Sequence, residues 1–252
     1  MQMSFLGDKV QDAINLLKEH EPDNEPYYGA TSGGKDSIVI MELAEMADVK
    51  VEWHCSLTTV DPPELLNFIK KYHPEVIFNK PETNMFDLIV KKRMPPARIA
   101  RYCCEYFKEN GGNGRVVITG IRKKESLKRS KREVIECISS QQSIIVNPII
   151  YWSNVDVWDF IRENNLPYCS LYDEGFKRLG CVGCPMATPK GQKAQFKRWP
   201  YFRRLYIKAF QRMVDKRKED GLETRWESGE DVMEWWLTKK TKYDDKTLNL
   251  FD

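Results

Sequence analysis

A glycine turn beside lysine, aspartate and serine side chains is the stretch of this sequence best suited to chemistry. It reads SGGKDS, residues 32–37, between a short β-like run (27–31) and an apolar helical run (38–47). A strand, a glycine turn and a helix start together present backbone N–H groups and the positive end of the helix dipole to an anion. Lys35 adds a mobile positive charge, and the spacing differs from both the GxxxxGK[ST] and the GxGxxG loops. The sequence predicts a phosphate-binding loop, with a chance serine–glycine turn as the alternative.

Two pairs of cysteines form a second candidate site, Cys103-Cys104 and Cys181-Val182-Gly183-Cys184. Four thiolates are the full protein complement of a structural zinc or of a 4Fe–4S cluster. Adjacent cysteines chelate a single tetrahedral zinc poorly, whereas a cluster offers several irons to neighbouring thiolates. The spacing favours the cluster; structural zinc, a redox CxxC and buried free cysteines stay open. The single cysteines Cys55, Cys137 and Cys169 lie in apolar segments and are interpreted as buried small hydrophobes.

Strand-like and helix-like segments alternate through most of the chain. Strands are expected at 27–31, 49–57, 76–78, 115–119 and 143–146, and helices at 38–47, 62–72, 84–92, 99–108 and 153–162. This alternation predicts an α/β fold with a doubly wound, mainly parallel sheet, which binds ligands at the carboxyl ends of its strands. Residues 32–37, Thr58-Thr59 and Gly120-Ile121-Arg122 each follow a predicted strand. We expect all three to meet in one crevice.

The strand pattern stops after Pro185 and gives way to a helical region. A long helix is expected over 191–220, broken at Pro200, and a last helix over 228–239. The predicted organisation is an N-terminal helix and linker (1–26), an α/β domain that includes the cysteine pairs (27–187), and a basic helical C-terminal region (188–252).

Charge is concentrated in two basic blocks. The net charge of the chain is only +3. Residues 122–132 hold seven Lys or Arg against one Glu, and residues 186–218 hold eleven against one Asp. Such blocks are typical of solvated helix faces or of surfaces that neutralise a polyanion. The chain shows no apolar run of about eighteen residues and no secretory signal, so we expect a cytoplasmic protein.

Residues 32–37 resemble the PP-loop of N-type ATP pyrophosphatases. Three further stretches, 119–126, 147–158 and 171–175, narrow the resemblance to the phosphoadenosine phosphosulfate (PAPS) reductase-like family, in the family's order over about residues 27–187. The cysteine pairs resemble the CC…CxxC iron–sulfur motif of assimilatory adenylyl sulfate reductases. The resemblance implies an adenine nucleotide alpha hydrolase-like fold that uses ATP, adenylyl sulfate or PAPS, with Mg²⁺ and a 4Fe–4S cluster.

The same resemblance implies the site residues. Asp36 is expected to help hold Mg²⁺ or to play a structural role at the helix start, and Arg122 and Arg129 are expected to bind phosphate or sulfate, with surface charge as the alternative. The expected catalytic residues are Lys35, Asp36 and Arg122. The expected nucleotide-binding residues are Ser32, Gly33, Gly34, Lys35, Asp36, Ser37, Thr58, Gly120, Arg122 and Arg129. The expected cluster ligands are Cys103, Cys104, Cys181 and Cys184.

The sequence departs from the reductases of this family in two places. Those enzymes carry a nucleophilic cysteine in a C-terminal Glu-Cys-Gly-x-His setting, whereas no cysteine follows Cys184 here. Residues 58–64 also differ from the reductases' Thr-Gly and Glu-Thr pattern. We therefore expect an ATP pyrophosphatase that adenylates an acceptor for sulfur transfer. A DNA or tRNA acceptor would bind the basic C-terminal helices, and a sulfur-donor protein would be a further partner. The alternatives are a sulfonucleotide reductase that uses an external thiol and a non-catalytic nucleotide or nucleic-acid binding module.

Overall fold

The computed structural model of the chain describes residues 6–109 and 111–238. The start of the N-terminal region, the predicted helix end at residue 239 and the remainder of the C-terminal region lie outside them. The described residues form two units. The first comprises Met1–Leu57, Pro62–Lys80 and Glu109–Gly180, and the second comprises Thr58–Asp61, Pro81–Lys108 and Cys181–Asp252. The second unit thus also includes segments from the middle of the sequence. The domain boundaries expected after residues 26 and 187 stay a prediction.

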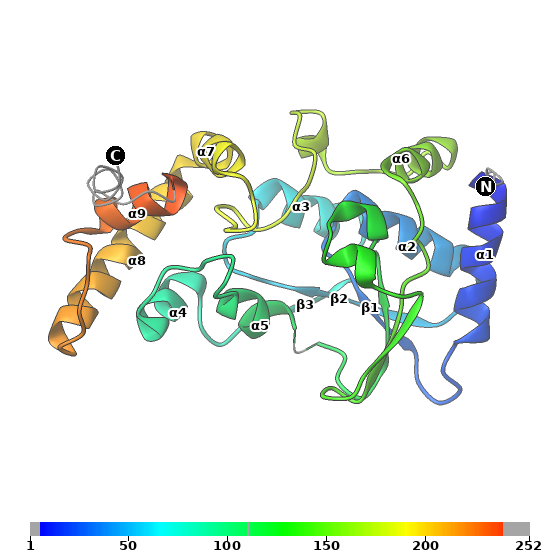
Figure 1. The fold of residues 1–252 in the computed structure, drawn as a ribbon. Helices are drawn as coiled ribbons and strands as arrows, with labels where there is room; N and C mark the ends of the chain where they lie inside the picture. The colour runs from blue at the N-terminus through cyan, green and yellow to red at the C-terminus, as the bar shows by residue number, and fades with distance from the viewer. Residues whose placement is uncertain (1–5, 110, 239–252) are drawn as a thin grey trace, which may run out of the picture. The chain divides into compact units, whose positions relative to one another are not determined.

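A six-stranded sheet forms the centre of the first unit (Figure 1). Its strands are β1 (Tyr27–Ala30), β2 (Val51–Ser56), β3 (Ile77–Asn79), β4 (Val116–Thr119), β5 (Ile135–Ile138) and β6 (Ser143–Val146), in the order β3-β2-β1-β4-β6-β5. All neighbours are parallel except β5 and β6. Ala30 at the end of β1 is level with Thr119 at the end of β4. The predicted mainly parallel sheet is confirmed, and the loops after β1 and β4 begin side by side.

Helices flank this sheet. They are α1 (Leu6–Glu19), α2 (Lys35–Met46), α3 (Pro63–Tyr72) and α6 (Asn154–Glu163), with 3₁₀ turns η1 (Lys123–Glu125), η2 (Arg129–Lys131) and η3 (Ser170–Tyr172). Helix α2 packs against α1 and α6 (Figure 1), and its Ile38, Val39 and Leu43 are buried. A capping box begins α6: the Ser153 side chain accepts from the Asp156 amide at 3.1 Å, and the Asp156 carboxylate accepts from the Ser153 amide at 2.6 Å.

Strand β5 was not predicted, and it corrects one expectation. It is a short strand at the end of the sheet, with a neighbour on one side only. Cys137 in its middle is exposed, so the interpretation of this cysteine as a buried hydrophobe was wrong. Successive side chains of a strand point to opposite faces, and an edge strand is covered incompletely. Cys55 and Cys169 are buried as expected.

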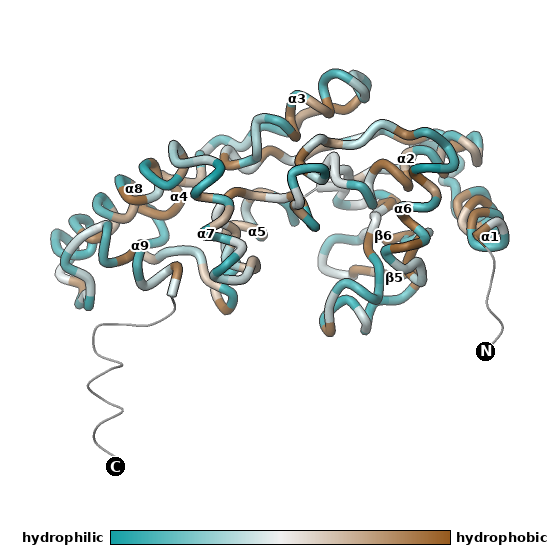
Figure 2. The backbone as a smooth tube through the Cα atoms, turned by 90° about the horizontal axis from the view of Figure 1, so that it is seen from above, coloured by the Kyte–Doolittle hydropathy of each residue, from teal (hydrophilic) through white to brown (hydrophobic). Residues whose placement is uncertain are grey.

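The second unit is helical. Its helices are α4 (Met85–Lys92), α5 (Tyr102–Lys108), α7 (Pro189–Arg198), α8 (Pro200–Glu219) and α9 (Gly229–Thr238). Polar and apolar residues alternate along α8 (Figure 2), and its inner side supplies aromatic residues to the core. The ring of Trp236 lies 4.9 Å from Tyr206 and 5.3 Å from Phe210, and its Nε1 donates to the Pro96 carbonyl at 2.6 Å. Within the described ranges, no helix has the length and apolar character needed to cross a membrane.

Replacing Trp236 with alanine should lower the free energy of unfolding by about 3–5 kcal/mol. The change removes a fully buried ring and leaves the Pro96 carbonyl without its donor. Urea unfolding followed by circular dichroism measures this loss. Tyr201→Ala is the control, because it removes a ring that is 59% exposed and should change stability by less than about 1 kcal/mol. Equal stabilities of the two variants would contradict the central place of Trp236 in this core.

Candidate functional site

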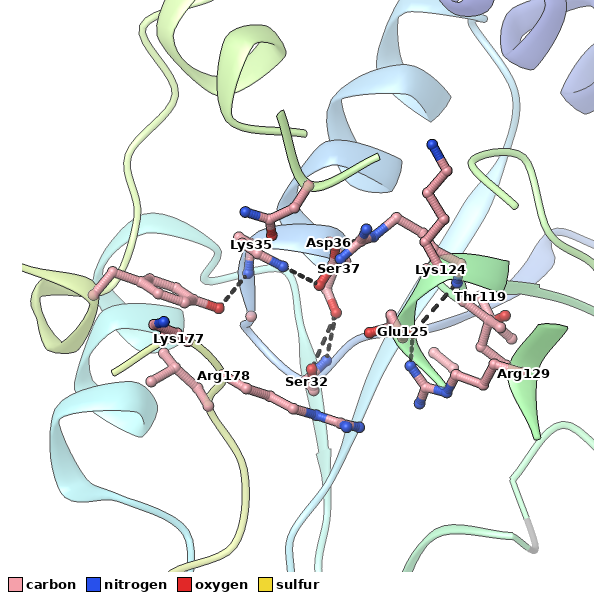
Figure 3. A pocket seen from close by; sticks show the side chains of 18 residues that line it. Ser32, Lys35, Asp36, Ser37, Thr119, Lys124, Glu125, Arg129, Lys177 and Arg178 are labelled. Atoms are coloured by element: carbon pink, nitrogen blue, oxygen red, sulfur yellow. Dashed lines mark hydrogen bonds and ion pairs between the residues drawn. The ribbon is translucent and has the colours of Figure 1, made fainter. Parts of the chain in front are cut away.

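A pocket of about 570 Å³ in the first unit collects most of the predicted nucleotide-binding residues (Figure 3). It lies where β1 and β4 end, as expected for a parallel sheet. Four segments line it, and we call it the polar pocket. Its polar lining residues are Ser32, Lys35, Asp36, Ser37, Thr119, Arg122, Lys124, Glu125, Arg129, Asn154, Tyr172, Lys177 and Arg178. Gly34 and Gly120 also line it.

The glycine loop at the start of α2 is braced from within. Ser37 Oγ accepts from the Ser32 amide at 3.1 Å and lies 3.2 Å from Ser32 Oγ. Gly33 has a positive φ of 66°, and a Cβ there would lie 2.6 Å from the Ile69 side chain. Only glycine fits this turn without strain. The Ser37 hydroxyl therefore holds the loop in shape, a role that the sequence did not reveal.

Backbone donors remain available at the helix start. The amides of Gly34 and Asp36 have no hydrogen-bond partner within the described ranges. The Lys35 amide donates to the Tyr172 hydroxyl at 2.9 Å. Unpaired N–H groups at a helix N-terminus attract anions through both hydrogen bonds and the helix dipole. The loop thus presents backbone donors where the sequence predicts a phosphate-binding loop, and phosphate binding itself stays a prediction.

Asp36 binds the two most buried cations of the pocket. Its Oδ2 lies 2.8 Å from Lys35 Nζ, and its Oδ1 lies 2.6 Å from Arg122 Nε. Lys35 and Arg122 are each only 4% exposed. Burial lowers the pKa of Lys35, and the Asp36 carboxylate opposes that shift. Each carboxylate oxygen thus already contacts one cation, and the expected contact of Asp36 with Mg²⁺ stays a prediction.

Close packing brings the end of β4 to this ion pair. A Cβ at Gly120 would lie 2.9 Å from the Asp36 carbonyl oxygen. The chain can therefore pass from Gly120 to Arg122 beside α2 only because position 120 has no side chain. This contact explains why a glycine precedes the arginine in the predicted motif.

The pocket holds more positive charge than the sequence motifs indicated. Sequence reasoning did not assign Lys124, Lys177 and Arg178 to the site. Arg129 pairs with Glu125, and burial together with Arg178 lowers the pKa of Arg129 to about 10. Six cations thus face two carboxylates, the cations being Lys35, Arg122, Lys124, Arg129, Lys177 and Arg178. Lys177 and Arg178 follow shortly after the motif at 171–175. This position close to a motif was the signal in the sequence that could have assigned them to the site.

Gly33, inside the glycine loop, is one predicted nucleotide-binding residue that does not line the polar pocket, and Thr58 is the other. It belongs to the second unit, where its amide and hydroxyl both donate to the Asp61 carboxylate, at 2.7 and 2.8 Å. Thr58 is buried. Its polar atoms are used to close its own loop, a local pairing that its position after a strand did not reveal.

The second cysteine pair is held by the aromatic core of the second unit. Gly183 has a φ of +75°, and a Cβ there would lie 2.6 Å from the Phe196 ring. Its carbonyl accepts from Gln192 Nε2 at 3.1 Å. Val182 is buried, and its amide donates to the Val60 carbonyl at 2.8 Å. Gly183 thus allows a tight turn between Cys181 and Cys184, and hydrogen bonds from Gln192 and to Val60 support it.

All four motif cysteines lie in the second unit and influence one another. The hydrogen bond between the adjacent thiols raises the pKa of Cys103 and lowers that of Cys104 to about 5. Burial raises the pKa of Cys184, and the negative charge of Cys181 adds to this shift. The described residues contain no group of three or more His, Cys, Asp or Glu side chains already arranged around a metal. The donor chemistry fits an iron–sulfur cluster, and the cluster itself stays a prediction.

Comparison with known proteins agrees with this geometry. Residues 27–187 match the family model of the phosphoadenosine phosphosulfate reductase domain. An adenosine 5'-phosphosulfate reductase of Oceanobacillus iheyensis is 38% identical over 77% of this chain and 86% of its own length. An uncharacterized protein of Methanocaldococcus jannaschii is 31% identical over 75% of this chain, which spans only 42% of that relative.

Solved structures share the fold at low sequence identity. A PAPS reductase of Candida auris in a phosphate complex has a TM-score of 0.53 at 20% identity, over 72% of this chain and 96% of its own. The U34-tRNA thiolase NcsA of Methanococcus maripaludis, solved with its [4Fe-4S] cluster, has a TM-score of 0.50 at 11% identity, over 87% of this chain and 81% of its own. The family match, the 38% identical relative and the pocket at the ends of β1 and β4 lead to one conclusion: the chain belongs to the phosphoadenosine phosphosulfate reductase domain family.

Proposed function

We propose that this protein is an ATP pyrophosphatase that adenylates an acceptor for sulfur transfer. The observation that carries the proposal is the excess of cations in the polar pocket, six against two carboxylates, around a glycine loop with unpaired amides. A triphosphate and its developing pyrophosphate need this kind of charge stabilisation. The acceptor nucleophile would attack the α-phosphorus and release pyrophosphate, and a sulfur nucleophile would then displace AMP.

Different groups of the polar pocket would bind the leaving pyrophosphate and neutralise its charge. The amides of Gly34 and Asp36 would bind oxygens of the leaving pyrophosphate. Lys35 and Arg122 would neutralise its charge, while Asp36 holds both cations in place. Mg²⁺ would arrive with ATP and be held chiefly by the phosphates. A resident metal is not needed for these steps of binding and orientation.

Arg129 and the cations missed in the sequence complete the proposed site. Arg129, Lys177 and Arg178 line the same pocket, and the last two lie on the segment after η3. They would bind the remaining phosphate oxygens or the acceptor. Their number favours a ligand with several negative charges, such as ATP or PAPS, because like charges gathered in a pocket repel one another until an anion binds.

The nearest rival is reduction of adenylyl sulfate or PAPS with an external thiol. The 38% identical relative named as an adenosine 5'-phosphosulfate reductase favours it. Against it, residues 185–238 form α7, α8 and α9 and supply no cysteine. Cys169 in the first unit is only 1% exposed, and burial raises its pKa, which suppresses the thiolate. A non-catalytic binding module is the third possibility.

The cluster and the acceptor belong to the same proposal. Cys103, Cys104, Cys181 and Cys184 would hold a 4Fe–4S cluster, which supplies iron sites able to bind sulfur or an electron. All seven cysteines are free, as suits the reducing cytoplasm in which we place the protein. The tRNA thiolase neighbour carries such a cluster, and a nucleic-acid acceptor would suit the basic helices after Pro185.

The reaction is tested by product analysis. ATP with Mg²⁺ should yield AMP and pyrophosphate, slowly when water replaces the acceptor. Adenylyl sulfate with thioredoxin should yield no sulfite, because no exposed thiol is available near the pocket to attack sulfur. Sulfite that disappears in Cys169→Ser would instead establish the reductase. Nucleotide binding with neither product, even with DNA or RNA added, would leave only the binding module.

Loss of the Lys35 charge should weaken nucleotide binding by about 1.5–3 kcal/mol, or about 10–150-fold. Calorimetry with ATP measures this for Lys35→Ala. Ser37→Ala should also weaken binding, because the Ser32 amide loses its acceptor. Lys50→Ala removes an exposed charge from the same unit and serves as the control. Equal affinity in all four proteins would exclude the loop as the nucleotide anchor.

The pH dependence follows from the lowered pKa of Lys35. A lysine is charged below its pKa, so wild-type affinity should fall as the pH rises through that lowered value. Lys35→Ala has no such charge to lose and should show a flatter profile above neutral pH. Calorimetric titrations between neutral pH and about pH 10 compare the two proteins. Parallel profiles would show that Lys35 does not contact the phosphates.

Iron and sulfide analysis tests the cysteine assignment. Anaerobically purified protein should contain about four irons and four sulfides per chain. Cys103→Ser and Cys184→Ser should deplete iron, whereas Cys55→Ser and Cys137→Ser should retain it. Stoichiometric zinc in a colourless protein would contradict the cluster.

A further inference from the structure

The second unit has a pocket of its own that the proposed reaction does not use. It has a volume of about 760 Å³ and is open to solvent. It lies among the end of α4, the last turns of α8 and the loop before α9. We call it the basic pocket. Its lining residues are Lys92, Arg93, Met94, Arg217, Glu223, Thr224, Arg225 and Trp226.

Positive charge dominates this pocket, with four cations against one carboxylate. Arg93 is paired with Asp220. Lys92, Arg217 and Arg225 have no carboxylate partner in the described part of the chain. Arg217 instead donates to two backbone carbonyls, that of Arg93 at 2.8 Å and that of Glu223. These bonds fix its guanidinium and leave its charge uncompensated.

A cluster of planar side chains borders the basic pocket, and two of its members, Arg225 and Trp226, line the pocket. The Arg225 guanidinium lies 4.8 Å from the Trp226 ring and 4.7 Å from the Trp235 ring. The two indoles are 5.2 Å apart. The Trp226 Nε1 and the Arg217 Nε are buried without a hydrogen-bond partner among the described residues. The planar surfaces of Arg225 and Trp226 at the pocket suit a planar ligand that stacks on them.

A line of cations leads along α8 to this pocket. Arg204, Lys208, Arg212 and Lys216 recur at every fourth position and therefore lie on one side of the helix. At 1.5 Å per residue this line is about 18 Å long. Two of the four, Arg212 and Lys216, also pair with carboxylates. The line ends beside Arg217, so the basic surface continues beyond the pocket.

We infer that the basic pocket binds one nucleotide of a single-stranded nucleic acid, whose backbone continues along α8. The base would stack on Trp226 and Arg225, and phosphates would contact Lys92 and Arg217. Cations that track phosphates combined with aromatic stacking platforms are the physical basis of single-strand binding without sequence preference. A merely solvated helix face would need the charges but not the contact of Arg225 with the Trp226 ring. The inference rests on the proposed function in one respect, since it gives the acceptor a binding site.

Fluorescence anisotropy with labelled oligo(dT) and oligo(U) of about 12 nucleotides tests this site without ATP. Trp226→Ala should weaken binding about tenfold through lost stacking. Arg225→Lys keeps the charge but loses the planar stack, and should weaken binding less. Lys92→Ala should lower the slope of log K against log salt by about 0.7. Lys193→Ala removes an exposed charge of α7 outside the pocket and should bind like the wild type, apart from a small general effect.

Equal oligonucleotide affinity in the wild type and in all four variants would overturn the inference. Failure of the wild type to bind either oligonucleotide would also overturn it. Comparison of oligo(dT) with oligo(U) identifies DNA or RNA as the better source of the strand. Circular dichroism confirms folding, and Arg225→Lys preserves the test if Trp226→Ala unfolds. Release of pyrophosphate from ATP is measured in parallel. Turnover without oligonucleotide binding overturns the basic pocket alone, whereas binding without any turnover overturns the proposed reaction alone.

Discussion

The ion pairs of Asp36 with Lys35 and Arg122 are the constraint on which the polar pocket depends. One carboxylate holds two almost fully buried cations at the start of α2. Without it, the two positive charges would face each other in a poorly solvated site, which is strongly unfavourable. The pair with Arg122 also joins α2 to the segment after β4. Charge compensation within the loop therefore also determines where the β4 segment lies.

The sequence predicted the site where the chemistry is local. Residues 32–37 form the turn after β1 and the start of α2, as expected, because glycine, lysine and serine act over a few residues. Lys177 and Arg178 were missed because their approach depends on how the segment after η3 packs. Thr58 lies outside the polar pocket, and its pairing with Asp61 could not be read from the predicted strand before it. Contacts that depend on tertiary packing cannot be predicted from the spacing of residues in the sequence.

The fold was predictable to a similar degree. The parallel strands and the helices between them follow from alternating apolar segments, and Pro200 marks the start of α8 as expected. Strand β5 escaped notice because four residues with a charge in the middle carry little periodic signal. The aromatic residues of the basic C-terminal block proved to form a core around Trp236. Helix α8 thus has an apolar side that packs into the core and a cationic side on its outer face, as is typical of a surface helix.

The exposed position of Cys137 has a practical consequence for anyone who handles this protein. It is the one cysteine of the seven that is exposed, and it lies on the edge strand of the sheet. A maleimide dye can therefore reach the first unit at the sheet edge without opening its core. Air oxidation can likewise join two molecules through this thiol. Labelling of the first unit alone would require the motif cysteines to be ligated or replaced, because the half-buried Cys104 has its pKa lowered to about 5 and is the more reactive thiolate.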